Sequence, residues 1–202
     1  MTARRSRRRW SRVWGGAAAF AAVAAALGAW LAMEGDLDGG IRAAPESTSA
    51  ATEASVPRRP ADAFALTVDH VFDGDTIEAR VAAPNDVMRG TDPMRVRLIG
   101  VDTPEGTPSP ECWADEARDH LRMLLPEGSV VWAVPDTEWR DRYDRVLLYV
   151  WTGDGRFVNH ELVRAGDAEA LLVEPNRAHF PLLADAEASA IAAGAGRWGA
   201  CG

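Results

Sequence analysis

The chain of 202 residues contains no lysine, so arginine supplies all 22 of its basic side chains. We draw no function from this preference, because it runs through the whole chain. Acidic residues number 30, and the formal net charge is −8. The sequence therefore lacks the general positive charge by which many proteins hold nucleic acid. Cysteine is also scarce, since only Cys112 and Cys201 occur.

The few cysteines and histidines argue against a zinc site. None of the four histidines stands at ligand spacing from either cysteine. In an exported domain, an even pair of cysteines more often forms a disulfide than a metal site. We therefore expect a disulfide between Cys112 and Cys201 that pins the C-terminal tail to the first helix. Two unpaired thiols are the alternative.

Charged residues are absent from 13–33, a run of 21 residues that follows six arginines. This pattern predicts a cytoplasmic N-terminus and an exported remainder. The run exceeds the ~7–15 residues of a signal-peptide core and reaches the ~20 needed to span a bilayer. For residues 1–33 we favour an uncleaved anchor in the cell membrane over a cleaved signal peptide. Ala26-Leu27-Gly28 could serve as the cleavage site in the second case, which would lead to secretion.

Large apolar residues are nearly absent from 34–63, which holds several glycines, prolines and serines. Such a segment cannot bury enough surface to fold, so we interpret it as a flexible linker. The folded domain is then 64–202. It contains 13 arginines and 24 acidic residues, which gives 13 − 24 = −11. Any binding of nucleic acid must therefore depend on local positive charge at the site.

Short runs rich in valine, leucine and isoleucine predict five strands, and apolar residues at helical spacing predict three helices. The first helix is expected to open at Ser109 and Pro110, and the third to follow a cap at Asn176. A helix between the third and fourth strands suggests an α+β fold dominated by a five-stranded barrel of the oligonucleotide/oligosaccharide-binding (OB) type. The predicted strands are 64–72, 76–81, 94–101, 129–134 and 145–151, and the helices are 109–124, 158–165 and 178–193.

Two short turns are rich in carboxylates. Asp73-Gly74-Asp75 follows the first predicted strand, and Asp102-Thr103 ends the third. Carboxylate and carbonyl oxygens are the ligands that a hard cation such as calcium prefers. An Asp-Gly turn alone is most often structural. The prediction of a cation site therefore depends on the two turns together.

Three more side chains complete the pattern. Arg97 alternates with apolar residues on a predicted strand, and an inward-facing arginine can bind a phosphate or a carboxylate with two hydrogen bonds. Glu105 follows the second carboxylate turn, and Arg145 ends an arginine-rich turn at 140–145. Phosphodiester hydrolysis needs a nucleophilic water, charge neutralisation at phosphorus and stabilisation of the leaving oxygen. Each residue alone has a structural interpretation, but together they predict a nuclease.

The segment 68–198 resembles the thermonuclease (staphylococcal nuclease-like) family. Four motifs stand in the family's order and at its approximate spacing. They are Asp-Gly-Asp-Thr at 73–76, Arg-Leu-Ile-Gly-Val-Asp-Thr-Pro-Glu at 97–105, Asp-Arg-Tyr-Asp-Arg at 141–145 and Val-Asn-His-Glu-Leu-Val-Arg-Ala-Gly at 158–166. The resemblance implies the same five-stranded barrel with three helices.

The resemblance also implies a calcium site. Asp75 and Asp102 match the family's calcium-binding carboxylates, and the backbone carbonyl of Thr103 matches a further ligand. Glu105 matches the carboxylate that orients or deprotonates the attacking water. Asp73 matches a supporting position.

The resemblance also implies a phosphate-binding site made by Arg97 and the arginine-rich turn. Arg97 and Arg145 match the two arginines that clamp the phosphate and stabilise its charge in the transition state. Arg142 and Tyr143 match further substrate contacts, and Asp141 matches a supporting position. The implied protein is a calcium-dependent endonuclease that cleaves DNA and RNA with little sequence specificity. We expect nucleic acid as its substrate, no protein partner and a monomeric state.

One departure from the family concerns the base of the substrate. Two tyrosines that pack against it in the well-studied member are replaced here by 170–174, which holds no aromatic residue. Stacking worth about 1–3 kcal/mol per base would be lost, unless Trp139 substitutes. The acidic domain and this loss favour the rival interpretation, a non-catalytic module that binds nucleic acid or protein on the same fold. The complete set of site residues favours the enzyme.

Overall fold

The computed structural model describes residues 55–202. The predicted membrane segment and most of the linker lie outside the described residues. Across 55–202, no helix combines the length and apolar character needed to cross a bilayer. The C-terminal end of the expected linker contacts the barrel at two points. The indole N–H of Trp151 donates to the carbonyl oxygen of Pro57 at 3.0 Å, and the Arg59 guanidinium lies 4.1 Å from the centre of the Trp132 ring.

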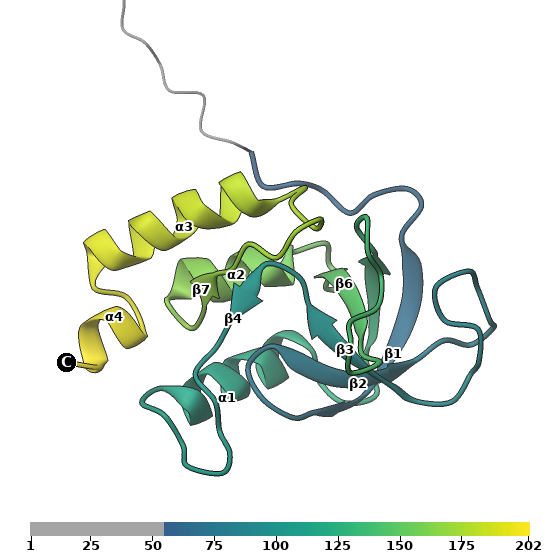
Figure 1. The fold of residues 1–202 in the computed structure, drawn as a ribbon, viewed down its shortest axis with the longest axis horizontal. Helices are drawn as coiled ribbons and strands as arrows, with labels where there is room; N and C mark the ends of the chain where they lie inside the picture. The colour runs from purple at the N-terminus through teal and green to yellow at the C-terminus, as the bar shows by residue number, and fades with distance from the viewer. Residues whose placement is uncertain (1–54) are drawn as a thin grey trace, which may run out of the picture. The chain divides into compact units, whose positions relative to one another are not determined.

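Five strands close into a barrel (Figure 1). Their order around it is β1-β2-β3-β6-β5, and β5 pairs again with β1. Every pair is antiparallel except β3 with β6, which is parallel. The predicted barrel is confirmed. Its strands are β1 (Phe64–Val71), β2 (Thr76–Arg80), β3 (Met94–Leu98), β5 (Val130–Val134) and β6 (Val146–Trp151).

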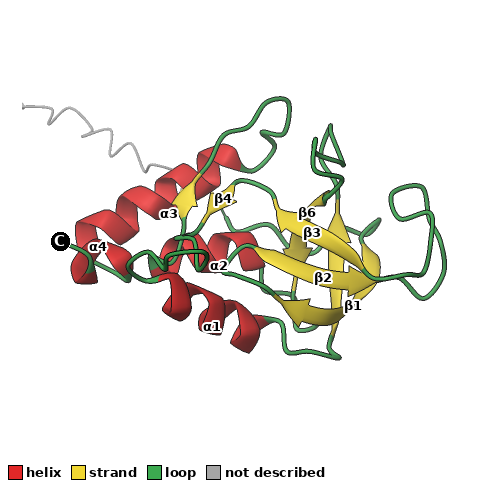
Figure 2. Cartoon of the chain, turned by 60° about the horizontal axis from the view of Figure 1, so that its bottom comes forward, coloured by secondary structure: helices red, strands yellow, loops and turns green. Residues whose placement is uncertain are grey.

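The three predicted helices are confirmed as α1 (Ala114–Leu124), α2 (Val158–Ala165) and α3 (Phe180–Ala193). A short helix that was not predicted, α4 (Arg197–Ala200), follows them. The helices gather at one end of the barrel, as Figures 1 and 2 both show. Amphipathic α1 turns its apolar stripe inward, since Ala117, Leu121 and Leu124 are buried. The apolar faces of helices and barrel thus share one core.

The predicted start of the first helix is wrong. We expected Ser109 and Pro110 to open it, but α1 begins at Ala114. Trp113 has a φ angle of 77°, in the left-handed region, so the helix cannot extend back through it. The preceding residues form a loop instead, in which the Glu111 N–H donates to the carbonyl oxygen of Glu105 at 2.9 Å.

The predicted third strand is too long at its C-terminal end. β3 ends at Leu98, because Gly100 adopts a φ of +79° and turns the chain. Glycine adopts this φ without strain, and an added Cβ would lie 2.6 Å from Cδ1 of Leu183, which would have to move. The chain then forms β4 (Val101–Asp102), which pairs with β7 (Glu169–Ala170) in a separate two-stranded sheet. This turn brings Asp102 back toward β3.

A buried asparagine on α2 holds this turn in place. The side-chain oxygen of Asn159 accepts the Val150 N–H at 3.0 Å, and its amide nitrogen donates to the carbonyl oxygen of Ile99 at 2.7 Å. Asn159 is fully buried. It therefore satisfies two backbone groups that water does not reach.

Replacement of Asn159 with alanine is expected to lower the free energy of unfolding by about 2–4 kcal/mol, because it leaves a buried donor and a buried acceptor unpaired. Chemical denaturation of the two proteins measures the difference. The exposed Ser189→Ala variant is the control and is expected to stay within about 0.5 kcal/mol of the parent. An Asn159→Ala protein as stable as this control would contradict the assignment.

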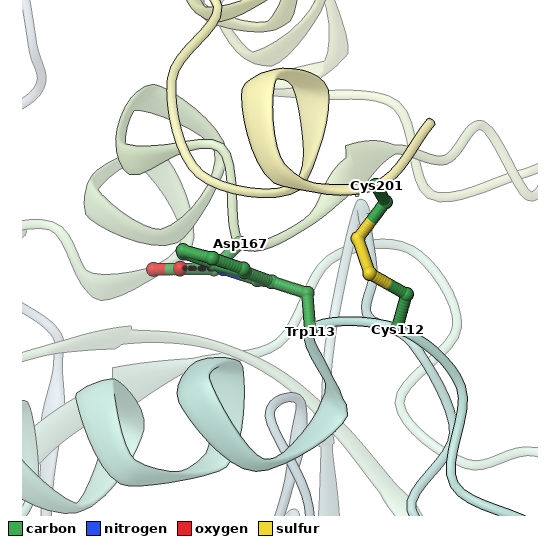
Figure 3. Close-up of a disulfide and its surroundings, with 4 residues drawn as sticks. All are labelled: Cys112, Trp113, Asp167 and Cys201. Carbon is green, nitrogen blue, oxygen red and sulfur yellow. Dashed lines mark hydrogen bonds between the residues drawn. A yellow bond between two sulfur atoms is a disulfide. The ribbon is translucent and has the colours of Figure 1, made fainter.

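The two cysteines form a disulfide that joins the segment before α1 to the segment after α4 (Figure 3). The Cα atoms of Cys112 and Cys201 are 5.9 Å apart. Next to the bridge, the indole N–H of Trp113 donates to the buried Asp167 carboxylate at 2.8 Å. The C-terminal end of the chain is thus fixed against the start of α1.

Candidate active site

The two carboxylate turns meet where β1 ends and β2 begins. Gly74 permits their approach, since a Cβ at this position would lie 2.8 Å from Cγ2 of Thr103. The Thr103 N–H donates to Oδ2 of Asp75 at 3.1 Å, and the Thr76 hydroxyl donates to its Oδ1 at 3.0 Å. The N–H of Asp75 in turn contacts Oδ1 of Asp73 at 3.3 Å. The turns therefore form one polar cluster around Asp75.

Arg97 connects this cluster to the second turn. Its guanidinium forms an ion pair with Asp75 and a second one with Asp102, in which Nη2 lies 2.7 Å from Oδ1. Nη1 also donates to the carbonyl oxygen of Val101 at 2.8 Å. Arg97 is well buried, with 13% of its side chain exposed, whereas 52% of Asp102 is exposed. The structure thus brings Asp75 together with Arg97 and Asp102, which come 22 and 27 residues later in the sequence.

Burial has the largest effect on the pKa of the Asp75 carboxyl. It raises the pKa of the Asp75 carboxyl to about 7, while the Arg97 guanidinium opposes the rise and the Asp73 carboxylate adds to it. A cation next to Asp75 would favour its charged form for the same electrostatic reason.

The arginine-rich turn is organised by Asp141. Its carboxylate accepts the backbone N–H groups of Tyr143 and Arg145, both at 2.9 Å, and the Nε–H of Arg145 at 2.7 Å. Burial alone would raise the pKa of Asp141, but these hydrogen bonds outweigh it and hold the pKa below its usual range. Asp144 has a φ of 66°, which closes the turn just before β6. Arg145 is therefore held in one orientation by a carboxylate four residues before it.

The two predicted phosphate-binding arginines share a cavity of about 530 Å³. Arg97 and Arg145 both line it, together with Arg142 and the exposed Tyr143. The guanidinium carbon of Arg142 lies 4.7 Å from the centre of the Tyr143 ring, and that of Arg145 lies 5.5 Å from it. The remaining wall is mainly apolar and includes Leu147, Leu171 and Val173. Trp139, the predicted substitute for the missing tyrosines, is not among its lining residues.

Glu105 lies on the exposed loop that follows Thr103. Its backbone N–H donates to Oε2 of Glu111 at 3.1 Å, and its carbonyl oxygen accepts the Glu111 N–H. Within residues 55–202, no hydrogen bond or ion pair joins the Glu105 carboxylate to Asp75 or Arg97. The structure fixes the backbone of Glu105 near the cluster and leaves its side chain exposed.

Asn176, which lines the cavity, has a different role from the predicted one. We expected Asn176 to cap α3, but the residue before that helix is His179 and no side chain caps it. Asn176 is buried and its amide bonds twice to the backbone of Glu138, accepting the N–H at 2.7 Å and donating to the carbonyl oxygen at 2.8 Å. It therefore joins two loops that line the cavity. The only sequence signal was its place after Pro175, which is typical of a turn as well as a cap.

The donor set of the cluster suits a hard cation. The carboxylates of Asp75 and Asp102 pair with the single guanidinium of Arg97, and the Asp73 carboxylate accepts the N–H of Asp75, so an excess of negative charge remains. Oxygen ligands of this type are those calcium prefers. Residues 55–202, this cluster included, contain no group of three or more histidine, cysteine, aspartate or glutamate side chains that could hold a metal by themselves. Any cation here would need backbone carbonyl, substrate or water oxygens in addition.

Comparison with known proteins identifies relatives of this chain. Residues 95–200 match the family described as staphylococcal nuclease homologue. The chain is 35% identical to the thermonuclease of Staphylococcus intermedius over 127 residues. These residues make up 61% of this chain and 69% of that protein. It is 36% identical to the thermonuclease of Staphylococcus hyicus over 113 residues, and these make up 54% of this chain and 60% of that protein.

A third relative is much longer than this chain. The endonuclease YhcR of Bacillus subtilis (strain 168) is 34% identical over 116 residues, which cover 54% of this chain and 9% of that protein. The chain thus spans a small part of one relative and about two thirds of the other two.

Proposed function

Because the chain belongs to the family of staphylococcal nuclease homologues, we propose that it is a calcium-dependent endonuclease that hydrolyses phosphodiester bonds of DNA and RNA. The observation that carries the proposal is the position of two arginines. Arg97 and Arg145 line one cavity, and Arg97 also contacts Asp75 and Asp102. Two relatives are named thermonuclease and a third endonuclease, which supports the same activity here.

The proposed calcium ligands are the carboxylates of Asp75 and Asp102 and the backbone carbonyl of Thr103. Their oxygen atoms fit the preference of calcium, and the surplus negative charge of the cluster would favour its binding. When bound, calcium would supply a positive charge near the phosphate oxygens. This charge would offset part of the repulsion between an acidic domain and a polyanionic substrate.

The remaining steps belong to side chains of the chain itself. Arg97 and Arg145 would hold the phosphate between them and stabilise the negative charge that develops on its oxygens. Glu105 would orient the attacking water and accept its proton, since its exposed carboxylate lies two residues after Thr103, next to the cluster. Arg142 and Tyr143 would contact the substrate at the rim of the cavity.

We propose that the domain acts outside the cytoplasm, anchored by residues 1–33. The arginine-rich start and the uncharged run in the sequence support this location. The Cys112–Cys201 disulfide supports it as well, since such bonds persist in oxidising compartments.

The activity can be tested by fluorescence-monitored hydrolysis of a labelled single-stranded oligonucleotide by the full chain. Cleavage is expected in millimolar calcium and is expected to stop when a chelator is added. If the folded protein binds the oligonucleotide in calcium and leaves it intact, the non-catalytic binding module would be the correct interpretation.

Replacement of Glu105 with glutamine is expected to lower kcat by about 10²–10⁴-fold, the usual contribution of a general base. Calcium affinity is expected to change far less, because the side chain is exposed and lies outside the Asp75 cluster. Calcium titration calorimetry and steady-state rates measure the two effects on one preparation. Asp75→Asn is the matched comparison and is expected to weaken calcium binding strongly. Equal loss of affinity and turnover in Glu105→Gln would reassign Glu105 as a calcium ligand.

A further inference from the structure

Most of the positive charge of this acidic domain is already neutralised. Residues 55–202 contain 15 arginines. Ten of them form an ion pair with a carboxylate. The arginines without such a pair in this part of the chain are Arg58, Arg59, Arg89, Arg95 and Arg142. These five are the cations most available to a polyanion.

Arg142 already lines the cavity of the proposed active site. Of the other four, Arg95 is the one placed beside both Arg97 and Arg145. It lies two residues before Arg97 on β3, so the two side chains point to the same face of the strand. β3 and β6 are parallel, with Val96 paired to Val146, which places Arg95 next to Arg145 in the neighbouring chain segment. A hollow of about 490 Å³ is lined by Arg95, Arg145 and Tyr143.

The conformation of Arg95 suits a phosphate ligand. Its guanidinium carbon lies 4.1 Å from the centre of the Phe72 ring, so the planar group rests on an aromatic face. Stacking of this kind restrains the side chain and leaves the N–H groups at its edge free to donate. Glu78 is the register partner of Arg95 on β2, but the two side chains form no ion pair in the part of the chain that the structure describes.

We propose that Arg95 binds a phosphate group of the polynucleotide adjacent to the scissile one. This inference rests on the proposed nuclease function and extends it. A single-stranded substrate carries one negative charge per nucleotide, so a scissile phosphate between Arg97 and Arg145 brings a neighbouring phosphate along the surface. The adjacent phosphate binds in the hollow beside Arg145, where the Arg95 guanidinium pairs with its negative charge. The site therefore favours polynucleotides over substrates with a single phosphodiester.

The test is equilibrium binding of a labelled single-stranded oligonucleotide to the full chain, followed by fluorescence anisotropy in chelator at several salt concentrations. Arg95→Ala is expected to weaken binding about 3–10-fold at low salt. The slope of log K against log salt is expected to fall in magnitude by about 0.7, the value for one lost phosphate contact on a single strand. Arg95→Lys is expected to retain the slope, because the positive charge remains.

Arg59→Ala is the matched control. Arg59 is also an exposed arginine without an ion pair, and it also stacks on an aromatic ring at 4.1 Å, but the ring is that of Trp132 on β5. Its loss is expected to leave both affinity and slope at the wild-type values. A slope for Arg95→Ala equal to that of the wild type, or no detectable binding by the wild type, would overturn the proposal.

Kinetics separate this proposal from the proposed function. In calcium, Arg95→Ala is expected to raise KM for the oligonucleotide with little effect on kcat, and the rise is expected to be absent for a small diester with one phosphate. Equal damage to both substrates would place Arg95 at the scissile phosphate and overturn the adjacent site. A wild type that shows the Arg95-dependent salt slope but does not cleave would refute the nuclease and retain the phosphate site.

Discussion

Alanine at position 97 or 145 is expected to lower kcat/KM for single-stranded DNA by about 10²–10³-fold or more. Each substitution removes a charge-assisted contact to a phosphate whose negative charge grows in the transition state. Steady-state rates in saturating calcium measure the loss. The two losses are expected to be less than additive in the double variant, because both arginines act on the same phosphate.

Stability must be measured beside activity for these variants. Arg97→Ala leaves the buried Asp75 carboxylate without its guanidinium, so a fall in melting temperature is expected. Arg145 is more exposed, at 30% of its side chain, and its removal is expected to disturb the fold less. Arg156→Ala, which breaks an exposed ion pair with Asp154, is the control for loss of one positive charge. Losses of tenfold or less at both 97 and 145 would reject the phosphate clamp.

Removal of the disulfide is expected to cause the largest change in stability. The bridge connects residues 89 apart in sequence, and a loop of that size corresponds to a loss of about 4.6 kcal/mol in the free energy of unfolding. For a domain of this size, that is a fall in melting temperature of about 9–18 °C. The Cys112→Ser/Cys201→Ser variant, compared with the parent by thermal unfolding, measures the effect.

Reductant provides the internal control for this prediction. It is expected to lower the melting temperature of the parent to that of the double serine variant and to leave the variant unchanged. A parent protein that melts at the same temperature with and without reductant would show that the bridge adds no stability.

The barrel could be predicted because its signals are local. Strands such as β3 alternate buried and exposed residues, and the stripe of α1 repeats at helical spacing. The pair β4 and β7 could not be predicted, because two residues are too few to show a period. The true start of α1 depends on the left-handed conformation of Trp113, which is uncommon for a bulky residue and has no sequence signal.

The sequence predicted which residues form the site, but not how these residues contact one another. The order of motifs indicated Asp75, Arg97, Asp102 and Arg145. The pairing of Arg97 with Asp75, however, depends on the register of β2 with β3, and its pairing with Asp102 depends on the turn at Gly100. The roles of Asn159 and Asn176 were missed for a related reason. Each amide bonds to backbone groups of other segments, so the partner is set by tertiary structure.

The parallel pairing of β3 with β6 has a consequence for how activity appears during folding. Arg97 and Arg145 are far apart in the sequence, and the pairing of β3 with β6 brings them together. Contacts between such distant segments form late, because a long loop must close first. A partly folded chain therefore has separate arginines and no clamp. The recovery of phosphodiesterase activity on refolding would report closure of the barrel, while helix formation would be silent in that assay.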